Sequence, residues 1–302
     1  MVRVTAFTVR VPATSANLGP GFDALGLALS LYDEVTARVT AEPTTVRVTG
    51  EGAGDLAKDE EHLVIKAMRE TFAEIGEQPA GIELTCVNAI PQARGLGSSS
   101  AAIVAGVTLA NALSGGKLSQ EDELRIAGRL EGHPDNVAPC LLGGFTIAWT
   151  SHDGARAVST EVHPAVQPAL FVPANRGLTK EARAALPASV PHADASFNAG
   201  RSALLVYALT KDPSLLFEAT EDRLHQDYRA PGMPESAALV KKLRGRKIAA
   251  VISGAGPTVL ALSGIPADFA GESGWVCHTL APESAGARVR PGNISSTLGH
   301  AE

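Results

Sequence analysis

A glycine-containing loop that leads into an apolar helix constrains the fold of this 302-residue chain more than any other stretch. Gly95-Leu96-Gly97 is followed by three serines and then by the small apolar run 102–113. Glycine adopts backbone conformations that other residues avoid, and the free N–H groups and dipole of a helix N-terminus attract anions. The helix is apolar on nearly every side, so we expect it to be buried. The loop is therefore predicted to hold a phosphate at a fixed place.

The loop departs from the two common phosphate-binding motifs. A P-loop would carry lysine directly after its second glycine, and this chain has Ser98 there. A dinucleotide-binding fingerprint would carry a third glycine where this chain has Ser100. The alternative to a phosphate site is an ordinary glycine turn with a serine N-cap. Other motifs along the chain have to distinguish these two readings.

Composition narrows the class of protein. The chain has 26 basic and 32 acidic residues, a net charge of −6, which argues against a basic nucleic-acid surface. It has no run of 18 apolar residues and no signal peptide at its start, so we expect a cytoplasmic protein. Cys86, Cys140 and Cys277 are odd in number and far apart, which favours reduced packing thiols over disulfides or a zinc site.

A second polar motif lies near the start of the chain. Residues 4–11 are typical of a strand that ends at Pro12, and residues 13–23 are rich in turn formers. The simplest interpretation of 13–23 is a surface loop. However, Asp23 leads into an apolar stretch, and a carboxylate held against a core needs a partner. A ligand amine would be such a partner.

A third motif follows a helix expected over residues 119–130. Glu131, His133, Asp135 and Asn136 occur within six residues, among Gly and Pro that favour a turn. An exposed polar loop is the simplest interpretation. However, the residues directly after it are apolar, which argues against a loop that is wholly solvated. Magnesium prefers oxygen ligands, usually one or two carboxylates with phosphate oxygens and water. Glu131 close to Ser98 would form such a site.

The remaining pattern predicts a mixed α+β chain. Strands are expected over 35–40, 45–49, 81–88, 145–149, 169–173, 247–252 and 258–262. Helices are expected over 61–75, 179–186, 193–209, 214–224 and 235–243. Residues 151–167 are a candidate linker, and the glycine-rich turn 253–257 is either a plain hairpin or a wall of a nucleotide site. Residues from 282 onward look like a frayed tail.

Three motifs together resemble the GHMP small-molecule kinase family. They are residues 11–29, 91–101 and 252–259, in the family's order and spacing, and the resemblance covers about the first 260 residues. The strings 12–23 and 132–139 resemble the branch of the family that phosphorylates homoserine. The resemblance implies a two-domain α+β fold, with an N-terminal ribosomal-protein-S5-like domain over 1–160 and a C-terminal ferredoxin-like domain over 161–283. Residues 284–302 are expected to be a flexible tail.

The resemblance also implies the ligands. ATP would bind the phosphate loop 91–101, Mg²⁺ would bind Ser98 and Glu131, and L-homoserine would be phosphorylated on its side-chain hydroxyl. His62 stands where the family usually has an asparagine that touches the nucleotide. The loop residues that the resemblance assigns to ATP are Pro91, Gln92, Ala93, Arg94, Gly95, Leu96, Gly97, Ser98, Ser99, Ser100 and Ala101.

The resemblance assigns the substrate as well. Asp23 would bind its amine, and Arg183 with Arg229 its carboxylate, because arginine offers a planar pair of donors. The other substrate-binding residues implied are Asn17, His133, Asp135, Asn136 and Thr179. Catalysis would rest on Asn17, Asp23 and Asn136, without a strong base, because phosphoryl transfer mainly needs in-line positioning and charge neutralisation.

Other functions remain open at this point. A GHMP kinase for mevalonate or a sugar would have the same loop, but mevalonate has no amine for Asp23 to bind. A catalytically inactive nucleotide-binding module would be expected to lack Ser98 or Glu131, and both are present. We expect no nucleic-acid or membrane partner, and a homodimer is left open.

Overall fold

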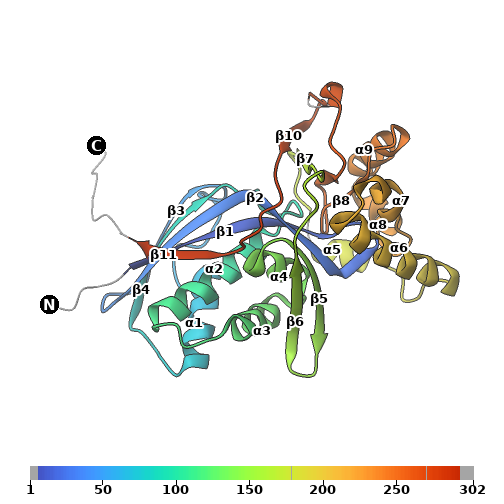
Figure 1. Cartoon of the computed structure of the whole chain (residues 1–302). Helices are drawn as coiled ribbons and strands as arrows, with labels where there is room; N and C mark the ends of the chain where they lie inside the picture. Colours follow the sequence, from blue (N-terminus) through green and yellow to red (C-terminus); the bar gives the residue numbers. More distant parts are fainter. Residues whose placement is uncertain (1–5, 178, 270, 293–302) are drawn as a thin grey trace.

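The computed structural model describes residues 6–177, 179–269 and 271–292. It confirms the expected α+β class, with two sheets and helices packed on each (Figure 1). The first sheet has the order β11-β1-β2-β4-β3, and β5 joins it through β2 and carries β6. The second has the order β10-β7-β9-β8. Within the described residues, no helix is long and apolar enough to cross a membrane.

The first sheet is built around two long antiparallel strands, β1 and β2, which pair along most of their length. Helices α1 to α4 gather on one side of it (Figure 1). The strands are β1 Ala6–Asn17, β2 Gly21–Thr40, β3 Thr45–Gly50, β4 Gly81–Asn88, β5 Phe145–Ser151, β6 Gly154–Thr160 and β11 Arg288–Gly292. The helices are α1 Leu63–Ile75, α2 Ser98–Leu113, α3 Gln120–Glu131 and α4 Pro134–Leu142.

Helix α2 lies at the centre of this half, as its apolar sequence predicts. Eleven of its residues, from Ser100 to Asn111, are buried, and it packs against α1, α3, α4 and β1. Burial of so many small side chains leaves little room for the helix to shift, because protein interiors are close-packed. The N-terminus of α2, at Ser98, is therefore fixed relative to the sheet.

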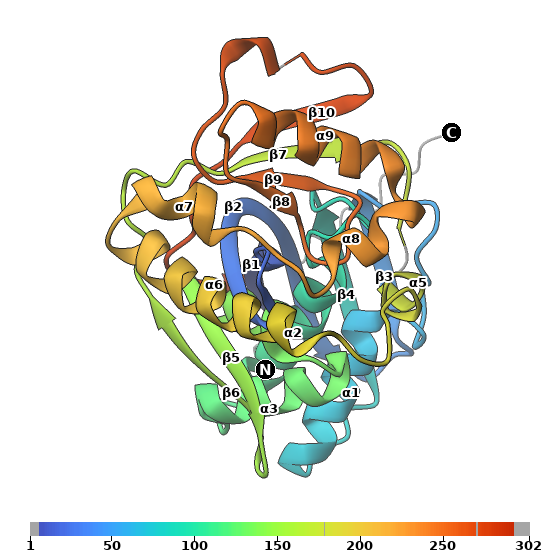
Figure 2. The ribbon, with the colours of Figure 1, turned by 90° about the vertical axis from the view of Figure 1, so that its right-hand side faces the viewer.

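The second half forms around the smaller sheet, and α9 lies beside that sheet (Figure 2). Its strands are β7 Ala169–Pro173, β8 Ala250–Ile252, β9 Val259–Ala261 and β10 Trp275–Thr279. Its helices are α5 Thr179–Ala184, α6 His192–Thr210, α7 Leu216–Ala219, α8 Gln226–Arg229 and α9 Pro234–Gly245, with 3-10 turns η1 Pro213–Leu215, η2 Ala230–Gly232 and η3 Ala267–Phe269.

The two halves share one hydrophobic core. Buried Val9 and Leu29 of the first sheet belong to the same cluster as Leu170 of β7 and Leu205 of α6. A smaller cluster joins Phe171 to α9. Because the main core continues across the boundary, side chains from both halves are held in register where they meet.

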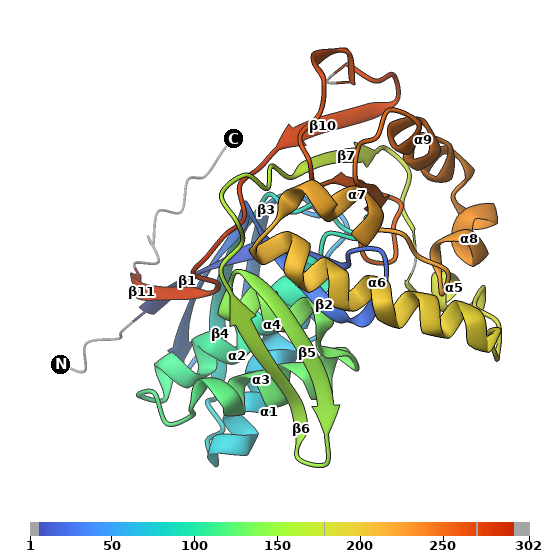
Figure 3. The ribbon, with the colours of Figure 1, turned by 45° about the vertical axis from the view of Figure 1, so that its right-hand side comes forward.

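Several expectations about secondary structure were wrong. The strand expected over 4–11 does not end at Pro12: β1 continues to Asn17, a short turn follows, and β2 begins at Gly21, so the simplest interpretation of 13–23 as a surface loop does not hold. Residues 134–142 form α4, with Pro134 in the first turn, where a missing N–H costs nothing. The candidate linker 151–167 contains β6, which pairs with β5 in a projecting hairpin (Figure 3). The helix expected over 214–224 ends at Ala219.

The expected flexible tail 284–302 is wrong for its first part. Residues 288–292 form β11, which pairs antiparallel with β1 from Ala6 to Arg10. The segment before β11 is also held in place at Glu283. The Glu283 N–H donates to the Ala28 carbonyl at 2.9 Å, and the Tyr32 hydroxyl donates to the Glu283 carboxylate. The rest of that prediction, residues 293–302, lies outside the described residues.

Candidate active site

The phosphate loop places Gly97 directly before α2, with a φ of 69°. A Cβ at this position would lie 1.9 Å from the Thr14 Oγ1 and 3.3 Å from the Asn136 Oδ1. Position 97 therefore requires glycine for two reasons, since the left-handed conformation and the close approach both exclude a side chain. The free N–H groups of the first turn of α2 consequently stay open to a ligand.

The three motifs meet at this loop. The Ser253 hydroxyl, from the turn between β8 and β9, donates to the Gly95 carbonyl at 2.6 Å, and the Thr14 N–H donates to the Leu96 carbonyl at 3.1 Å. The turn 253–257 is thus a hairpin turn that also packs on the loop. Arg94 uses its guanidinium to bind the Pro173 carbonyl at 2.9 Å, as well as two further carbonyls. It ties the loop to the second half.

Glu131, the last residue of α3, faces the start of α2. Its carboxylate accepts hydrogen bonds from the Ser99 hydroxyl at 3.0 Å and the Ser100 hydroxyl at 2.7 Å, rather than from Ser98. No group of three or more His, Cys, Asp and Glu side chains in the described part of the chain could hold a metal. One carboxylate beside hydroxyls suits a magnesium ion that completes its shell with phosphate oxygens and water.

A small polar cavity of about 100 Å³ lies between the loop and the second half. It brings together residues from six separate parts of the sequence. Of the substrate residues expected from the sequence, all but Thr179 line it; Thr179 begins α5, and its side chain lies outside what the structure describes. The lining residues used below are Asn17, Asp23, Glu131, His133, Asp135, Asn136, Arg183 and Arg229.

Asp23 and Arg183 form a bidentate ion pair across this cavity, with distances of 2.6 and 2.9 Å between nitrogen and oxygen. Asp23 has a φ of 55°, and its N–H is held by the Asn17 Oδ1 at 3.0 Å. The Asn17 Nδ2 donates to the Gly254 carbonyl at 2.9 Å. Asn17 therefore fixes the backbone that carries Asp23 and joins it to the β8–β9 turn.

Arg229 is buried, with 3% of its surface exposed, yet its hydrogen-bond partners are neutral. It donates to the Ala182 carbonyl at 3.1 Å, to the His225 Nδ1 at 3.3 Å and to the Gly254 carbonyl at 3.5 Å. Burial, together with the nearby positive charge of Arg183, lowers the pKa of Arg229 from its ordinary value. A buried cation without a bonded carboxylate is a site for an anionic ligand.

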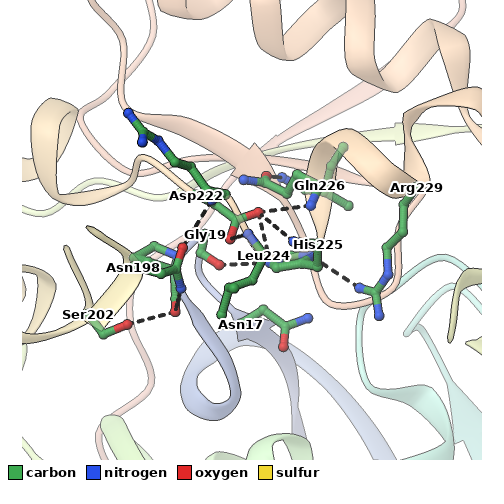
Figure 4. Close-up of polar contacts among 12 residues, drawn as sticks. Asn17, Gly19, Asn198, Ser202, Asp222, Leu224, His225, Gln226 and Arg229 are labelled. Atoms are coloured by element: carbon green, nitrogen blue, oxygen red, sulfur yellow. Dashed lines mark hydrogen bonds and ion pairs between the residues drawn. The ribbon is translucent and has the colours of Figure 1, made fainter. Parts of the chain in front are cut away.

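Helix α6 and the segment that carries Arg229 together hold the turn between β1 and β2, the latter through the bond from His225 to the Gly19 carbonyl (Figure 4). The Asn198 Nδ2 and the Ser202 hydroxyl both donate to the Pro20 carbonyl at 2.6 Å. Asp222 accepts from the N–H groups of Leu224, His225 and Gln226 and so holds the backbone that leads into α8. The turn of the first half and the arginine of the second half are thus parts of one hydrogen-bonded unit.

Two further side chains of the cavity are oriented by neighbours. The His133 Nδ1 lies 2.7 Å from the Asp135 Oδ1, and this hydrogen bond raises the pKa of His133. The Asn136 Oδ1 accepts from the buried Thr14 hydroxyl at 2.8 Å. Asn136 consequently presents its NH₂ group to a ligand, and it can donate a hydrogen bond but cannot take a proton.

A second, more apolar cavity of about 320 Å³ adjoins the first. His62, Leu63 and Val64 line one part of it, and Ala93, Ser98 and Ser99 line both cavities. The His62 Nδ1 accepts from the Val64 N–H at 3.3 Å and caps α1. Its Nε2 is buried and has no hydrogen-bond partner among the described residues. Burial lowers the pKa of His62, so the ring is neutral and Nε2 carries the proton.

Some residues of the site were missed by the sequence analysis. Asp33 lines the apolar cavity and accepts from the N–H groups of Ala89 and Ile90 at 2.7 and 2.9 Å, just before the loop. Burial raises its pKa to about 6. Thr14 and His225 were also missed. The Thr14–Asn136 and His225–Gly19 contacts each span more than 120 residues of the chain, so no local pattern could have identified these contacts.

Comparison with known proteins identifies the class. The model of the GHMP kinase N-terminal domain matches residues 62–144, and that of the GHMP kinase C-terminal domain matches residues 204–271. The two-sheet arrangement, the loop before a buried helix and the site between the halves agree with these matches. The chain belongs to the GHMP kinase family, a family of ATP-dependent kinases.

Within this family the chain is similar to homoserine kinases. It is 54% identical over 297 residues to homoserine kinase of Streptomyces avermitilis, covering 96% of this chain and 97% of the relative. It is 53% identical over 261 residues to homoserine kinase of Clavibacter michiganensis, covering 85% and 83%. The crystal structure of homoserine kinase from Cytophaga hutchinsonii superposes with a TM-score of 0.83 at 30% identity, covering 96% and 99%.

Proposed function

We propose that this chain transfers the γ-phosphate of ATP to the side-chain hydroxyl of L-homoserine, giving O-phospho-L-homoserine and ADP. The observation that carries the proposal is the pair of adjoining cavities that share Ser98 and Ser99. The apolar cavity suits a nucleotide base, and the polar cavity is lined by charges that suit a zwitterion. The phosphate loop lies where the two meet, as a transfer between their ligands requires.

The loop would hold the phosphates through the N–H groups of the first turn of α2. Glu131 and the serine hydroxyls beside it fit the oxygen-ligand preference of Mg²⁺, which neutralises phosphate charge when it is bound. We assign Glu131 and Ser98 to this role, and we add Ser99 because its hydroxyl contacts the Glu131 carboxylate. The protein's own contribution is to fix these oxygens beside the loop before ATP arrives.

The Asp23–Arg183 ion pair matches the charges of an amino acid. An α-ammonium group would replace Arg183 at Asp23, and the α-carboxylate would bind Arg183 and Arg229. The side chains of Arg183 and Asp23 are 38% and 35% exposed, so opening the pair costs at most about 1 kcal/mol. The substrate would therefore exchange one ion pair for two, while Arg229 gains the anion that the free protein does not give it.

The transfer step needs orientation more than a base. Asn136, oriented by Thr14, would donate a hydrogen bond to the substrate hydroxyl or to the transferring phosphoryl group. The hydroxyl oxygen would bond the γ-phosphorus as the bond from phosphorus to the ADP oxygen breaks. The hydroxyl proton can pass to a phosphoryl oxygen during this step, because the transition state is loose and its charge lies on those oxygens. His133 and Asp135 would bound the space around the substrate and exclude water from it.

A mevalonate or sugar kinase is the alternative within the family. It gives no reason for Asp23 and Arg183 to face the cavity as a pair, because neither substrate carries an amine. A catalytically inactive nucleotide-binding module would not need the oxygen cluster at Glu131. The first alternative predicts turnover of a substrate without an ammonium group, and the second predicts no turnover of any substrate.

The test is an assay coupled to ADP release with homoserine, mevalonate, shikimate and galactose. Two analogues refine it: 4-hydroxybutanoate lacks the amine of homoserine, and 3-aminopropan-1-ol lacks its carboxylate. Loss of one partner of a desolvated charge pair costs about 2–5 kcal/mol, and the partial exposure of Asp23 places this case near 2, about thirtyfold in kcat/KM. We expect Asp23→Asn to lower kcat/KM for homoserine by this factor and to affect 4-hydroxybutanoate less. Equal losses would mean that Asp23 does not bind the amine.

A further inference from the structure

His225 is a buried titratable side chain that the reaction described above does not use. It is fully buried, 0% exposed, and lies between the β1–β2 turn and Arg229 (Figure 4). Its ring stacks on Phe22 with centroids 5.1 Å apart. The Arg229 guanidinium lies 5.2 Å from the centre of the same Phe22 ring. His225 therefore contacts both Phe22, which follows the β1–β2 turn, and Arg229, which lines the polar cavity.

The partners of His225 fix its tautomer. The Nε2 lies 2.7 Å from the Gly19 carbonyl oxygen, which can only accept, so Nε2 carries a proton. The Nδ1 lies 3.3 Å from the Arg229 Nη1, which can only donate, so Nδ1 carries a lone pair. With one nitrogen donating and the other accepting, the imidazole has to be neutral. Burial also lowers its pKa, despite the opposing charge of Asp222.

The neutral charge of the His225 ring is important for Arg229. A carboxylate in the place of this ring would form an ion pair with Arg229 and cancel the charge that attracts an anionic ligand. The acid beside His225 is Asp222, 3.6 Å from the His225 Nε2. Its oxygens are engaged by three backbone N–H groups of the segment that leads into α8. The guanidinium is thus held in one orientation by neutral acceptors, and its charge stays available.

From this geometry we infer that His225 is a positioning residue, which holds the Arg229 guanidinium toward the substrate carboxylate without neutralising it. Its Nε2 also bonds the Gly19 carbonyl, which anchors the imidazole to the turn that precedes Asp23. The inference rests on the proposed function, because it takes the carboxylate of homoserine as the ligand of Arg229.

Two substitutions separate the two bonds of the imidazole. The carboxamide of His225→Asn reaches as far as Nδ1 and can accept from Arg229, whereas that of His225→Gln reaches as far as Nε2 and can donate to the Gly19 carbonyl. Hydrogen bonds to charged groups contribute about 1.5–3 kcal/mol, about ten- to 150-fold. We expect His225→Gln to raise the homoserine KM at least tenfold with kcat and ATP affinity little changed, and His225→Asn to remain within about threefold of the wild type.

The substrate analogue without a carboxylate provides the control. Turnover of 3-aminopropan-1-ol should respond equally to the two substitutions, because it offers Arg229 no anion. A wild-type homoserine KM in His225→Gln, or the same KM increase for homoserine and 3-aminopropan-1-ol, would overturn the inference. Wild-type protein without homoserine turnover would instead refute the proposed function, so the two failures are distinguishable.

A measurement on the unmodified protein covers the case in which a substitution disturbs folding. Thermal melts establish whether both variants are folded at the assay temperature. Nitrogen-15 NMR of the histidine rings should then show His225 in the wild type as neutral, with the proton on Nε2, at pH 7. A charged ring, or a proton on Nδ1, would overturn the inference without any variant.

Discussion

His62 offers the sharpest test of the nucleotide cavity, because its two ring nitrogens have different roles. Nδ1 caps α1 by accepting from the Val64 N–H, and the Nε2–H is buried without a partner among the described residues. We propose that an acceptor nitrogen of the adenine ring binds this N–H. In the free protein the donor is already removed from water, so forming the bond strips no further water from the protein side.

The expected magnitude follows from that burial. A hydrogen bond between neutral groups contributes about 0.5–1.5 kcal/mol net. The His62 Nε2–H is already desolvated, so we expect its bond to ATP to contribute about 1–2 kcal/mol, which is about five- to thirtyfold in Kd. His62→Ser keeps an acceptor for the Val64 N–H, but its short hydroxyl cannot reach the position of the Nε2–H. His62→Asn keeps an acceptor for the Val64 N–H and adds an amide NH₂ group, which can donate to the nucleotide although it ends short of the position of Nε2. Serine and asparagine are comparable N-caps, so the two variants should be similar in stability.

Isothermal titration calorimetry with ATP measures the difference, and thermal melts check the cap. We expect the Kd of His62→Ser to rise five- to thirtyfold and that of His62→Asn to stay near the wild-type value. Deaza analogues of ATP, each lacking one ring nitrogen, identify the acceptor: the relevant analogue should bind the wild type weakly and lose nothing further in His62→Ser. Equal ATP affinity in the two variants would refute the reasoning.

Three further outcomes are expected. Glu131→Gln and Ser98→Ala should each lower turnover steeply and raise the Mg²⁺ concentration needed for half-maximal activity, while the melting temperature stays unchanged. Wild-type rates at limiting Mg²⁺ would count against Glu131 and Ser98 as Mg²⁺ ligands. Gly97→Val should abolish ATP binding in calorimetry, since a Cβ would meet the Thr14 Oγ1 at 1.9 Å; unchanged affinity would exclude the loop as the phosphate site. Burial raises the pKa of Asp33 from 3.8 to about 6, so the folded state binds the extra proton and stability falls as pH rises through this interval. Asp33→Asn should flatten that fall and add up to roughly 3 kcal/mol to the free energy of unfolding at pH 7, and a denaturation series with an unchanged pH dependence would contradict it.

Local patterns in the sequence predicted some elements well. The bounds of β4 and β7 were predicted as the structure has them, because each is a short run between turn residues. Helix α1 ends at Gly76, which has a φ of 84°, as a glycine after an apolar helical pattern indicates. The apolar helix α2 and the Ser119 cap of α3 were also evident from their residues alone.

Elements that depend on distant partners were not predictable in this way. The second part of β1 has turn-forming residues, and it is extended because β2 pairs with it. Strand β6 has a weak pattern of its own and forms as the second half of a hairpin with β5. Helix α4 contains Pro139 in its interior, which argues against a helix on local grounds. Its buried face against α2, α3 and β5 outweighs that preference.

The same distinction holds for the site. Charge and motif resemblance selected residues that the fold brings into one cavity, but the contacts among them were not foreseen. The Asp23–Arg183 pair spans 160 positions, and Glu131 contacts Ser99 and Ser100 where Ser98 was expected. Which of several neighbouring hydroxyls faces a carboxylate depends on helix phase and rotamer, which the sequence leaves undetermined.

The pairing of β11 with β1 has a consequence for how this chain is made. Strand β1 emerges from the ribosome early in synthesis. Strand β11, which pairs with the outer edge of β1, emerges only after the whole second half has been translated. Until residues 288–292 arrive, the backbone N–H and C=O groups along Ala6 to Arg10 are an open edge, which can recruit a strand from another chain. The nascent protein is therefore exposed to aggregation for nearly all of its translation. Release of this segment closes that edge and joins residues 6–10 and 288–292 in one sheet.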